Sequence, residues 1–142
     1  MLKVAKEFSF DMAHLLDGHD GKCQNLHGHT YKLQVIVSGE TEDNGAKKGM
    51  VIDFADLKRA VNELIISPMD HAFIYDQSSE RETKIAQLLQ QLNSKTFALP
   101  MRSTAENLAQ FIFQRLQENV GFHLHSVRLW ETPTSFAEYG EA

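Results

Sequence analysis

The sequence is poor in cysteine and proline and has no long apolar run. A single cysteine, Cys23, occurs among the 142 residues, so no disulfide can form within the chain, and a free thiol is typical of a reducing compartment. No segment approaches the roughly 20 apolar residues that span a bilayer, and residues 1–7 lack the apolar core of a signal peptide. We therefore expect a cytoplasmic protein that does not contact a membrane.

Positive charge is also scarce. The 14 lysines and arginines are outnumbered by 19 aspartates and glutamates, which gives a formal net charge of -5. Proteins whose main activity is binding nucleic acid usually carry a basic surface, so we expect no nucleic-acid partner. An anionic small substrate remains possible, because a local cluster of positive charge matters more than the total.

What the sequence does contain is the composition of an ordinary globular domain. Hydrophobic residues make up 42% and charged residues 23%, and the length fits one compact domain over residues 1–142. A monomer of this size buries a real core, but it has little volume left for a deep pocket of its own.

Two segments alternate between apolar and polar residues, as strands with one buried face do. The first covers residues 2–14 and the second covers residues 30–39. A polar turn follows the second segment and contains Asn44-Gly45, which is a strong hairpin signal. Met50–Ile52 would then be the returning strand.

Three helices are expected in the rest of the chain. Apolar residues at helical spacing predict the first over residues 54–65, with an aspartate as its N-cap and Pro68 just past its end. A second is expected over residues 82–92. The residues from Ser103 to Glu106 have the spacing of a capping box, which would open the third. With a last strand over residues 127–132, the order of elements predicts an α+β fold with an antiparallel sheet.

Three of the seven histidines share a geometry suited to binding a metal. His27 and His29 lead into a strand two residues apart, so their side chains point to one face roughly 7 Å apart. His14 continues the buried face of the first strand in the same way. If the two strands pair as a hairpin, the three rings meet at one end of the sheet. Three neutral imidazoles leave a fourth tetrahedral position open, as in catalytic zinc sites.

The histidine pattern alone does not single out zinc. Nickel, iron and copper are compatible with imidazole ligands, and histidines at strand ends often bind nothing. His123 and His125 form a second His-x-His pair with no third histidine in register, and we expect that pair to bind no metal.

Cys23 and the Asp70-His71 pair are candidates for proton transfer. Cys23 lies in a loop rich in Gly, Asp and His, four residues before His27, where cationic surroundings would make its thiol a usable base or nucleophile. A carboxylate beside an imidazole fixes the tautomer of the ring, which suits proton transfer. The plainer alternatives are a small core residue for Cys23 and a turn aspartate with a surface histidine for the pair.

Two further residues are candidates for binding a ligand. Glu131 shares the parity of Val127 and Leu129, which would aim its carboxylate inward, where a carboxylate normally has a partner. That partner would be an arginine or backbone group of the protein, or a ligand with two adjacent N–H donors such as the edge of a pterin ring. Thr104 lies in the capping box, which gives it a structural role besides any contact with a ligand.

Six stretches together resemble the 6-pyruvoyl-tetrahydropterin synthase / 6-carboxy-tetrahydropterin synthase family. They span nearly the whole chain in the family's order, and the Cys-x-x-x-His-Gly-His element is the most specific. The stretches are Phe8 to His14, Cys23 to His29, Gly49 to Phe54, Met69 to His71, Ser103 to Asn107 and Trp130 to Ser135. The resemblance implies a tunnelling fold, a four-stranded antiparallel sheet with helices on one face. It also implies that subunits join their sheets into a barrel, commonly as a homohexamer of two trimers with active sites at subunit interfaces.

The resemblance also assigns a cofactor and a substrate. It implies that His14, His27 and His29 bind Zn2+. The zinc would hold the side-chain hydroxyls of 7,8-dihydroneopterin triphosphate and acidify the adjacent C–H, which is a Lewis-acid role. Glu131 would anchor the amino-pyrimidinone edge of the pterin, and Thr104 is a weaker candidate for contact with the substrate.

The catalytic residues implied by the resemblance are Cys23 as the proton-abstracting thiol, with Asp70 and His71 as its relay. Eukaryotic-type members eliminate triphosphate to give 6-pyruvoyl-tetrahydropterin. The bacterial 6-carboxy type also releases acetaldehyde, and its product feeds synthesis of the 7-deazaguanine base of queuosine. The spacing from Cys23 to His29 and the ending from Arg128 to Ser135 resemble the bacterial type.

Three alternatives stay open at this point. A 6-pyruvoyl-tetrahydropterin synthase would use the same metal and base, and a non-catalytic zinc or pterin-binding module would keep the site without turnover. A branch that serves folate synthesis has glutamate in place of the thiol, and Cys23 argues against it. The stretch from Tyr75 to Leu99 is longer than in the shortest members of the family, and the sequence assigns no role to it.

Overall fold

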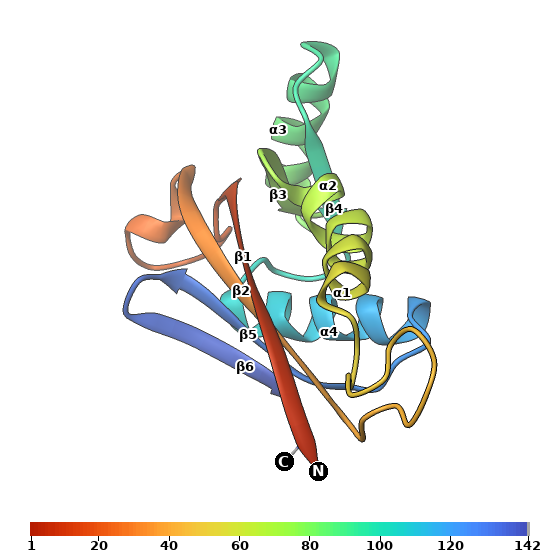
Figure 1. Ribbon diagram of the computed structural model, residues 1–142. Coiled ribbons are helices and arrows are strands. Elements are labelled where there is room, and N and C mark those ends of the chain that lie inside the picture. Colours follow the sequence, from red (N-terminus) through yellow and green to blue (C-terminus); the bar gives the residue numbers. More distant parts are fainter. Residues whose placement is uncertain (142) are drawn as a thin grey trace.

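The computed structural model describes residues 1–141, and its centre is one twisted sheet of six strands in the order β4-β3-β1-β2-β5-β6 (Figure 1). The strands are β1 Leu2–His14, β2 His27–Gly39, β3 Ala72–Asp76, β4 Thr96–Leu99, β5 Leu124–Thr132 and β6 Ser135–Gly140. The helical segments are η1 Lys22–Gln24, α1 Phe54–Val61, η2 Asn62–Ile66, α2 Ser67–Met69, α3 Glu80–Gln91 and α4 Ala105–Asn119.

β1 and β2 form the long antiparallel hairpin that the alternation predicts. Leu2 lies opposite Gly39 at one end, and His14 lies opposite His27 at the other. Because alternate side chains leave opposite faces of a strand, Phe10 and Tyr31 point together into the core, where they are 2% and 0% exposed. The antiparallel register therefore holds along the whole hairpin.

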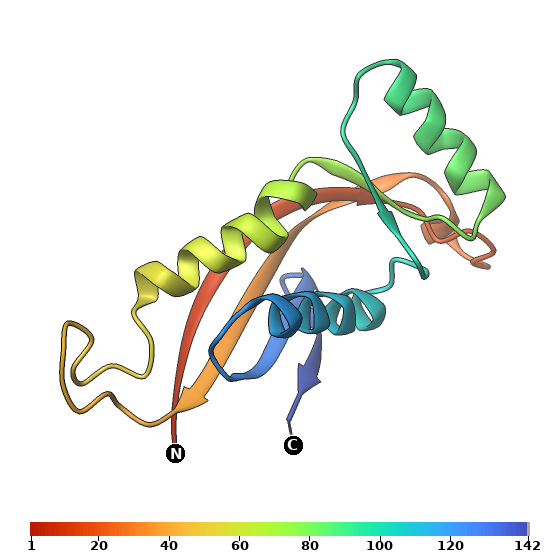
Figure 2. The same ribbon diagram turned by 90° about the vertical axis from the view of Figure 1, so that its right-hand side faces the viewer.

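The core lies between one face of the sheet and the helices α1 and α4. The continuous helical stretch from α1 through η2 to α2 buries Leu57, Val61 and Ile65, while α4 buries Leu108 and Ile112. These helices lie on the same side of β1 and β2 (Figures 1 and 2). The Asp53 carboxylate caps α1 by accepting a hydrogen bond from the Ala55 N–H at 2.9 Å, as predicted.

α3 packs against the opposite face, beside β3 and apart from the other helices (Figure 2). Leu15, Phe73 and Ala86 form a separate small apolar cluster there. In β3, Ala72 belongs to the main core while its neighbour Phe73 belongs to this second cluster, so the two clusters lie on opposite faces. The prediction that the helices lie on one face is therefore wrong for α3.

The sheet also differs from the predicted four antiparallel strands. β1, β2, β5 and β6 do form an antiparallel set, but β3 and β4 add two strands that run parallel to β1. The segment Met50–Ile52 is not a strand. Gly45 and Gly49 both have φ of 81°, so the chain turns twice within five residues, and Val51 and Ile52 pack against the core from a loop.

Two helix boundaries move as well. Pro68 lies inside α2, in the last helical turn, because a preceding π-helical turn carries the helix past residue 65. The cap of α4 is Thr104 rather than Ser103, since the Thr104 hydroxyl accepts from the Asn107 N–H at 3.2 Å. Within residues 1–141, no helix combines the length and apolarity needed to cross a bilayer.

Candidate metal centre and active site

His14, His27 and His29 converge at the end of the β1–β2 hairpin, on the face that carries the core. One ring nitrogen of each lies within 4.8 Å of one ring nitrogen of the other two. The ring centroid of His14 lies 4.7 Å from that of His27 and 5.3 Å from that of His29. The hairpin register produces this cluster, because His14 pairs with His27 and Met12 pairs with His29.

Backbone carbonyls fix the tautomers of two of these rings. The His14 Nδ1–H donates to the Ser103 carbonyl oxygen at 3.0 Å, and the His27 Nδ1–H donates to the Asn25 carbonyl oxygen at 2.7 Å. A carbonyl oxygen can only accept, so Nδ1 carries the hydrogen and Nε2 keeps a free lone pair. This arrangement is typical of metal-binding histidines, whose other ring nitrogen is held by a protein acceptor.

The residues present fit a divalent metal ion. His14 Nε2 and His29 Nε2 are buried, and neither has a hydrogen-bond partner among residues 1–141, an arrangement that is costly for polar atoms. Burial, with a smaller effect of the neighbouring His27, lowers the pKa of His14 to about 4. Burial also lowers the pKa of His29. Both rings are therefore neutral near pH 7, which is the form that binds Zn2+.

Glu131 lies beside this cluster, on the inward face of β5. Its Oε1 is 3.9 Å from His29 Nε2, and the side chain keeps 29% of its surface exposed. The buried Tyr31 ring lies beneath the histidines, 5.6 Å from the centroid of His29. Burial and the nearby Glu131 charge raise the pKa of Tyr31, so the Tyr31 hydroxyl stays protonated at neutral pH.

Cys23 and Thr104 lie in the segments that border the histidine cluster in sequence. Cys23 is partly buried in η1, within the loop that joins β1 to β2, and its carbonyl accepts a hydrogen bond from the Leu16 N–H at 2.8 Å. Thr104 caps α4 and directly follows Ser103, the residue that holds His14. The cap uses the Thr104 hydroxyl as an acceptor and leaves its own hydrogen available for donation.

Asp70 and His71 form a second cluster, in the turn between α2 and β3. The His71 Nδ1 lies 3.0 Å from Asp70 Oδ1, and its Nε2 lies 4.0 Å from Asp11 Oδ2. A hydrogen bond from the Asp11 N–H to Asp70, helped by the contact with His71, lowers the pKa of Asp70. Asp70 is therefore ionised at neutral pH and holds one nitrogen of the His71 ring.

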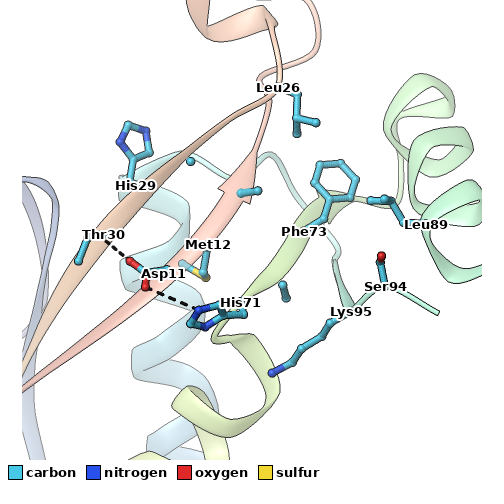
Figure 3. Close-up of a pocket in the computed structure, with 13 residues that line it drawn as sticks. Asp11, Met12, Leu26, His29, Thr30, His71, Phe73, Leu89, Ser94 and Lys95 are labelled. Carbon is cyan, nitrogen blue, oxygen red and sulfur yellow. Dashed lines mark hydrogen bonds and ion pairs between the residues drawn. The ribbon is translucent and has the colours of Figure 1, made fainter. Parts of the chain in front are cut away.

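This second cluster borders an open cavity of about 630 Å³ (Figure 3). Asp11 and His71 lie at one side of the cavity, and Leu89, Ser94 and Lys95 lie across from them. His71 is 74% exposed, so its ring is available to a group outside this chain.

The two clusters lie on opposite faces of β1. His14 points to the core face, and Asp11, three residues earlier, points to the other face because side chains alternate along a strand. Figure 3 shows the same separation, with the His29 ring turned away from Asp11 and His71. Within one chain, therefore, the Asp70-His71 pair does not meet the three histidines.

Some residues of the site carried no signal in the sequence. Asp11 and Lys95 contact the Asp70-His71 turn, and the backbone of Ser103 and Asn25 holds His14 and His27. Ser103 was predicted only as part of a capping box, whereas in the structure it contacts His14. His123 pairs with Glu141, and His125 contacts its neighbour Ser126.

Comparison with known proteins identifies the family. Residues 3–142 match the family model described as 6-pyruvoyl tetrahydropterin synthase. The chain is 68% identical, over 99% of its length and 100% of the relative, to a Haemophilus influenzae protein named 6-carboxy-5,6,7,8-tetrahydropterin synthase. A Synechocystis protein of the same name is 36% identical, over 96% of this chain and 91% of the relative.

Solved structures show the same fold. The 6-pyruvoyl tetrahydropterin synthase of Caenorhabditis elegans superimposes with a TM-score of 0.72 at 27% identity, over 99% of this chain and 96% of that one. An uncharacterized protein from Wolinella succinogenes gives a TM-score of 0.79 at 24% identity, over 99% and 98% of the two chains. The match to the family model and the two curated relatives cover nearly the whole chain. The chain therefore belongs to the 6-pyruvoyl tetrahydropterin synthase family of enzymes.

Proposed function

We propose that this enzyme is a zinc-dependent lyase of the bacterial 6-carboxy type. It would convert 7,8-dihydroneopterin triphosphate into 6-carboxy-5,6,7,8-tetrahydropterin, with release of acetaldehyde and triphosphate, in the synthesis of the 7-deazaguanine base of queuosine. The observation that carries the choice of product is the 68% identity to the Haemophilus influenzae relative of that name. The reaction would take place in the cytoplasm, where the free Cys23 thiol stays reduced.

The metal centre of this proposal consists of His14, His27 and His29. Three imidazoles with converging nitrogens and two buried, unpartnered Nε2 atoms support a bound cation, and three protein ligands leave a position for substrate. Zn2+ bound there would act as a Lewis acid toward the side-chain oxygens of the pterin. Glu131, beside His29, would accept two hydrogen bonds from the amino-pyrimidinone edge of the substrate, with Thr104 as a further donor.

Proton transfer falls to the remaining residues. Cys23 would remove a proton from the substrate side chain, and His71 would pass it on while Asp70 holds the opposite nitrogen of its ring. The ionised Asp70 carboxylate contacts His71 Nδ1 at 3.0 Å, which leaves Nε2 to face the reacting groups. This pairing is the arrangement in which a carboxylate orients a catalytic imidazole.

We further propose that each active site combines residues of two subunits. The Asp70-His71 pair and the histidine triad lie on opposite faces of β1, and His71 is largely exposed, so another copy of the chain would complete the site. The antiparallel set of strands has two free edges, namely β1 over residues 2–10 and the outer side of β6. Head-to-tail pairing of such edges closes a ring, as in a trimeric barrel, and two trimers would form a homohexamer.

Product analysis of the zinc-loaded protein tests the reaction. The protein is incubated with 7,8-dihydroneopterin triphosphate, and the pterin products are followed by mass spectrometry together with an assay for acetaldehyde. We expect 6-carboxy-5,6,7,8-tetrahydropterin and acetaldehyde in equal amounts. The Cys23→Ala variant serves as the control for nonenzymatic breakdown of the substrate.

A second candidate is 6-pyruvoyl-tetrahydropterin synthesis, in which triphosphate leaves and no acetaldehyde forms. The description of the matching family model and the Caenorhabditis elegans structure favour it. A pyruvoyl product without acetaldehyde would establish this candidate and refute the carboxy assignment. No turnover by zinc-replete protein would refute both.

A further inference from the structure

The backbone at His71 adopts a conformation that needs support. Its φ is 63°, in the left-handed region that residues with a Cβ occupy at a cost. Such a residue persists where the surrounding contacts hold it, and left-handed residues other than glycine cluster at functional sites. The contacts that hold this turn therefore also decide where the imidazole points.

Two of these contacts come from β1. The His71 N–H donates to the Asp11 carbonyl oxygen at 2.6 Å, and the Asp11 N–H donates to the Asp70 carboxylate at 2.9 Å. Both bonds fix the turn against the strand. They leave the carbonyl of Asp70, in the peptide that joins Asp70 to His71, without a bond from β1.

Lys95 supplies a further contact, besides the hydrogen bond from the Asp70 N–H to the Ile66 carbonyl oxygen at 2.8 Å. Its ammonium donates to the Asp70 carbonyl oxygen at 2.6 Å and to the Ser67 carbonyl oxygen, in the last turn of the preceding helix, at 2.7 Å. Lysines commonly bind the free carbonyls at helix C-termini. Within residues 1–141, Lys95 forms no ion pair with a carboxylate, so these two carbonyls are the partners that hold its head group.

The backbone of Lys95 is itself anchored beside the turn. Its carbonyl accepts a hydrogen bond from the Phe73 N–H at 3.0 Å, two residues after His71, and the chain then enters β4, which pairs with β3. The segment between β3 and β4, which contains α3, thus returns the chain to the catalytic turn. This return gives a role to the long segment from Tyr75 to Leu99, which the sequence left without one.

We propose that Lys95 is a positioning residue that holds the Asp70-His71 turn in its left-handed conformation and so aims the His71 imidazole. The inference rests on the proposed function of His71 in proton transfer. Lys95 acts on the backbone of the turn and not on the substrate, so its loss lowers kcat while KM stays unchanged. The competing explanation is that the third N–H of the ammonium binds the triphosphate directly. Loss of that contact would raise KM instead.

The test measures kcat and KM for Lys95→Met, which keeps an apolar stem and removes the donors, and for Lys95→Arg, which restores donors of similar reach. Lys84→Met is the matched control, because Lys84 is an exposed lysine of α3 that pairs with Glu80 at 3.1 Å. We expect kcat of Lys95→Met to fall on the order of tenfold, since small misplacements of a catalytic group cost up to about a hundredfold. Lys95→Arg should recover most of the loss, and Lys84→Met should equal the wild type.

A double-mutant cycle with His71→Ala separates positioning from other roles. If Lys95 acts through His71, adding Lys95→Met to His71→Ala causes no further loss of kcat. Additive losses, an increase in KM, or unchanged kinetics of Lys95→Met would each overturn the proposal. Turnover of the wild-type protein tests the proposed function separately, and zinc content and melting temperature of each variant show that the fold is intact.

Discussion

Burial of neutral His14 makes the stability of the metal-free protein depend on pH. The pKa of His14 is lowered to about 4 in the folded chain, against about 6.5 in the unfolded chain. A lowered folded-state pKa means that the unfolded state binds the proton more tightly, so acid favours unfolding. The contribution of His14 is therefore fully present above pH 6.5 and is lost as the pH falls from 6.5 toward 4.

The size of the effect follows from the difference between the two pKa values. A difference of about 2.5 units corresponds to about 3 kcal/mol of unfolding free energy when both forms are fully titrated. Between pH 7.5 and pH 5, where titration is incomplete, about 2 kcal/mol should be lost. A loss of this size is a large part of the stability of an ordinary domain.

Urea unfolding of chelator-treated protein, at pH 7.5 and pH 5 and at one fixed protein concentration, measures this loss. The His14→Gln variant lacks the titrating group, so its free energy of unfolding should fall by about 2 kcal/mol less than that of the wild type. His125→Gln is the control, because His125 lies in the same sheet, contacts Ser126 and is outside the cluster. Equal pH dependence in the wild type and His14→Gln would refute the reasoning.

Three further changes test the site and the sheet. Ser103→Ala should keep zinc affinity within about tenfold of the wild type in chelator competition, because the Ser103 carbonyl still accepts from His14. A loss as large as that of His14→Gln would instead make the hydroxyl the essential partner. Cys23→Ala should bind zinc at the normal ratio, measured by metal analysis, while turnover falls at least about a hundredfold; loss of zinc would place the thiol among the ligands. Gly140→Ala puts a Cβ into the His125 carbonyl oxygen of β5, so urea unfolding should show a larger loss than the roughly 1–2 kcal/mol expected of Gly45→Ala, which meets no atom within 4 Å. Equal losses would mean that the end of β6 simply frays.

The sequence predicted the part of the fold that depends on local alternation. In β1 and β2 most residues of one parity are apolar, and a hairpin between them must keep both apolar sets on one face. The observed register brings His14 next to His27, which meets the condition on which the sequence predicted that the three rings converge. The N-cap of α1 is equally local, since Asp53 bonds a backbone N–H two residues away.

The strands that were missed lack such a pattern. The first three residues of β3, Ala72, Phe73 and Ile74, are all buried, because α3 covers one face and the main core covers the other, and a strand buried on both faces does not alternate. β6 differs in another way, since Phe136 and Tyr139 are both exposed and only Ala137 packs against the core, so the strand shows too little apolar alternation to be recognised. Assembly with another subunit would give these residues a partner.

The contacts that complete the site were beyond prediction for a different reason. Asp11 meets Asp70 across 59 residues of sequence, and Lys95 reaches Asp70 across 25. Both contacts arise from β3 lying parallel to β1 and to β4, and a parallel neighbour needs a long crossover that no local pattern specifies. The register of distant strands, and not residue type, decides which polar groups meet the Asp70-His71 turn.

Because the two clusters lie on opposite faces of β1, two inactive variants should restore activity to each other when their subunits are mixed. One face of the strand carries His14, and the other carries Asp11 beside His71. In a ring of composite sites, each subunit would thus contribute its three histidines to one active site and its Asp70-His71 pair to another. Subunits carrying Cys23→Ala and subunits carrying His71→Ala would each be inactive alone. Random reassembly of an equal mixture would create some active sites that contain both an intact Cys23 and an intact His71. Such complementation would return about one quarter of the wild-type activity, a recovery that independent subunits could not produce.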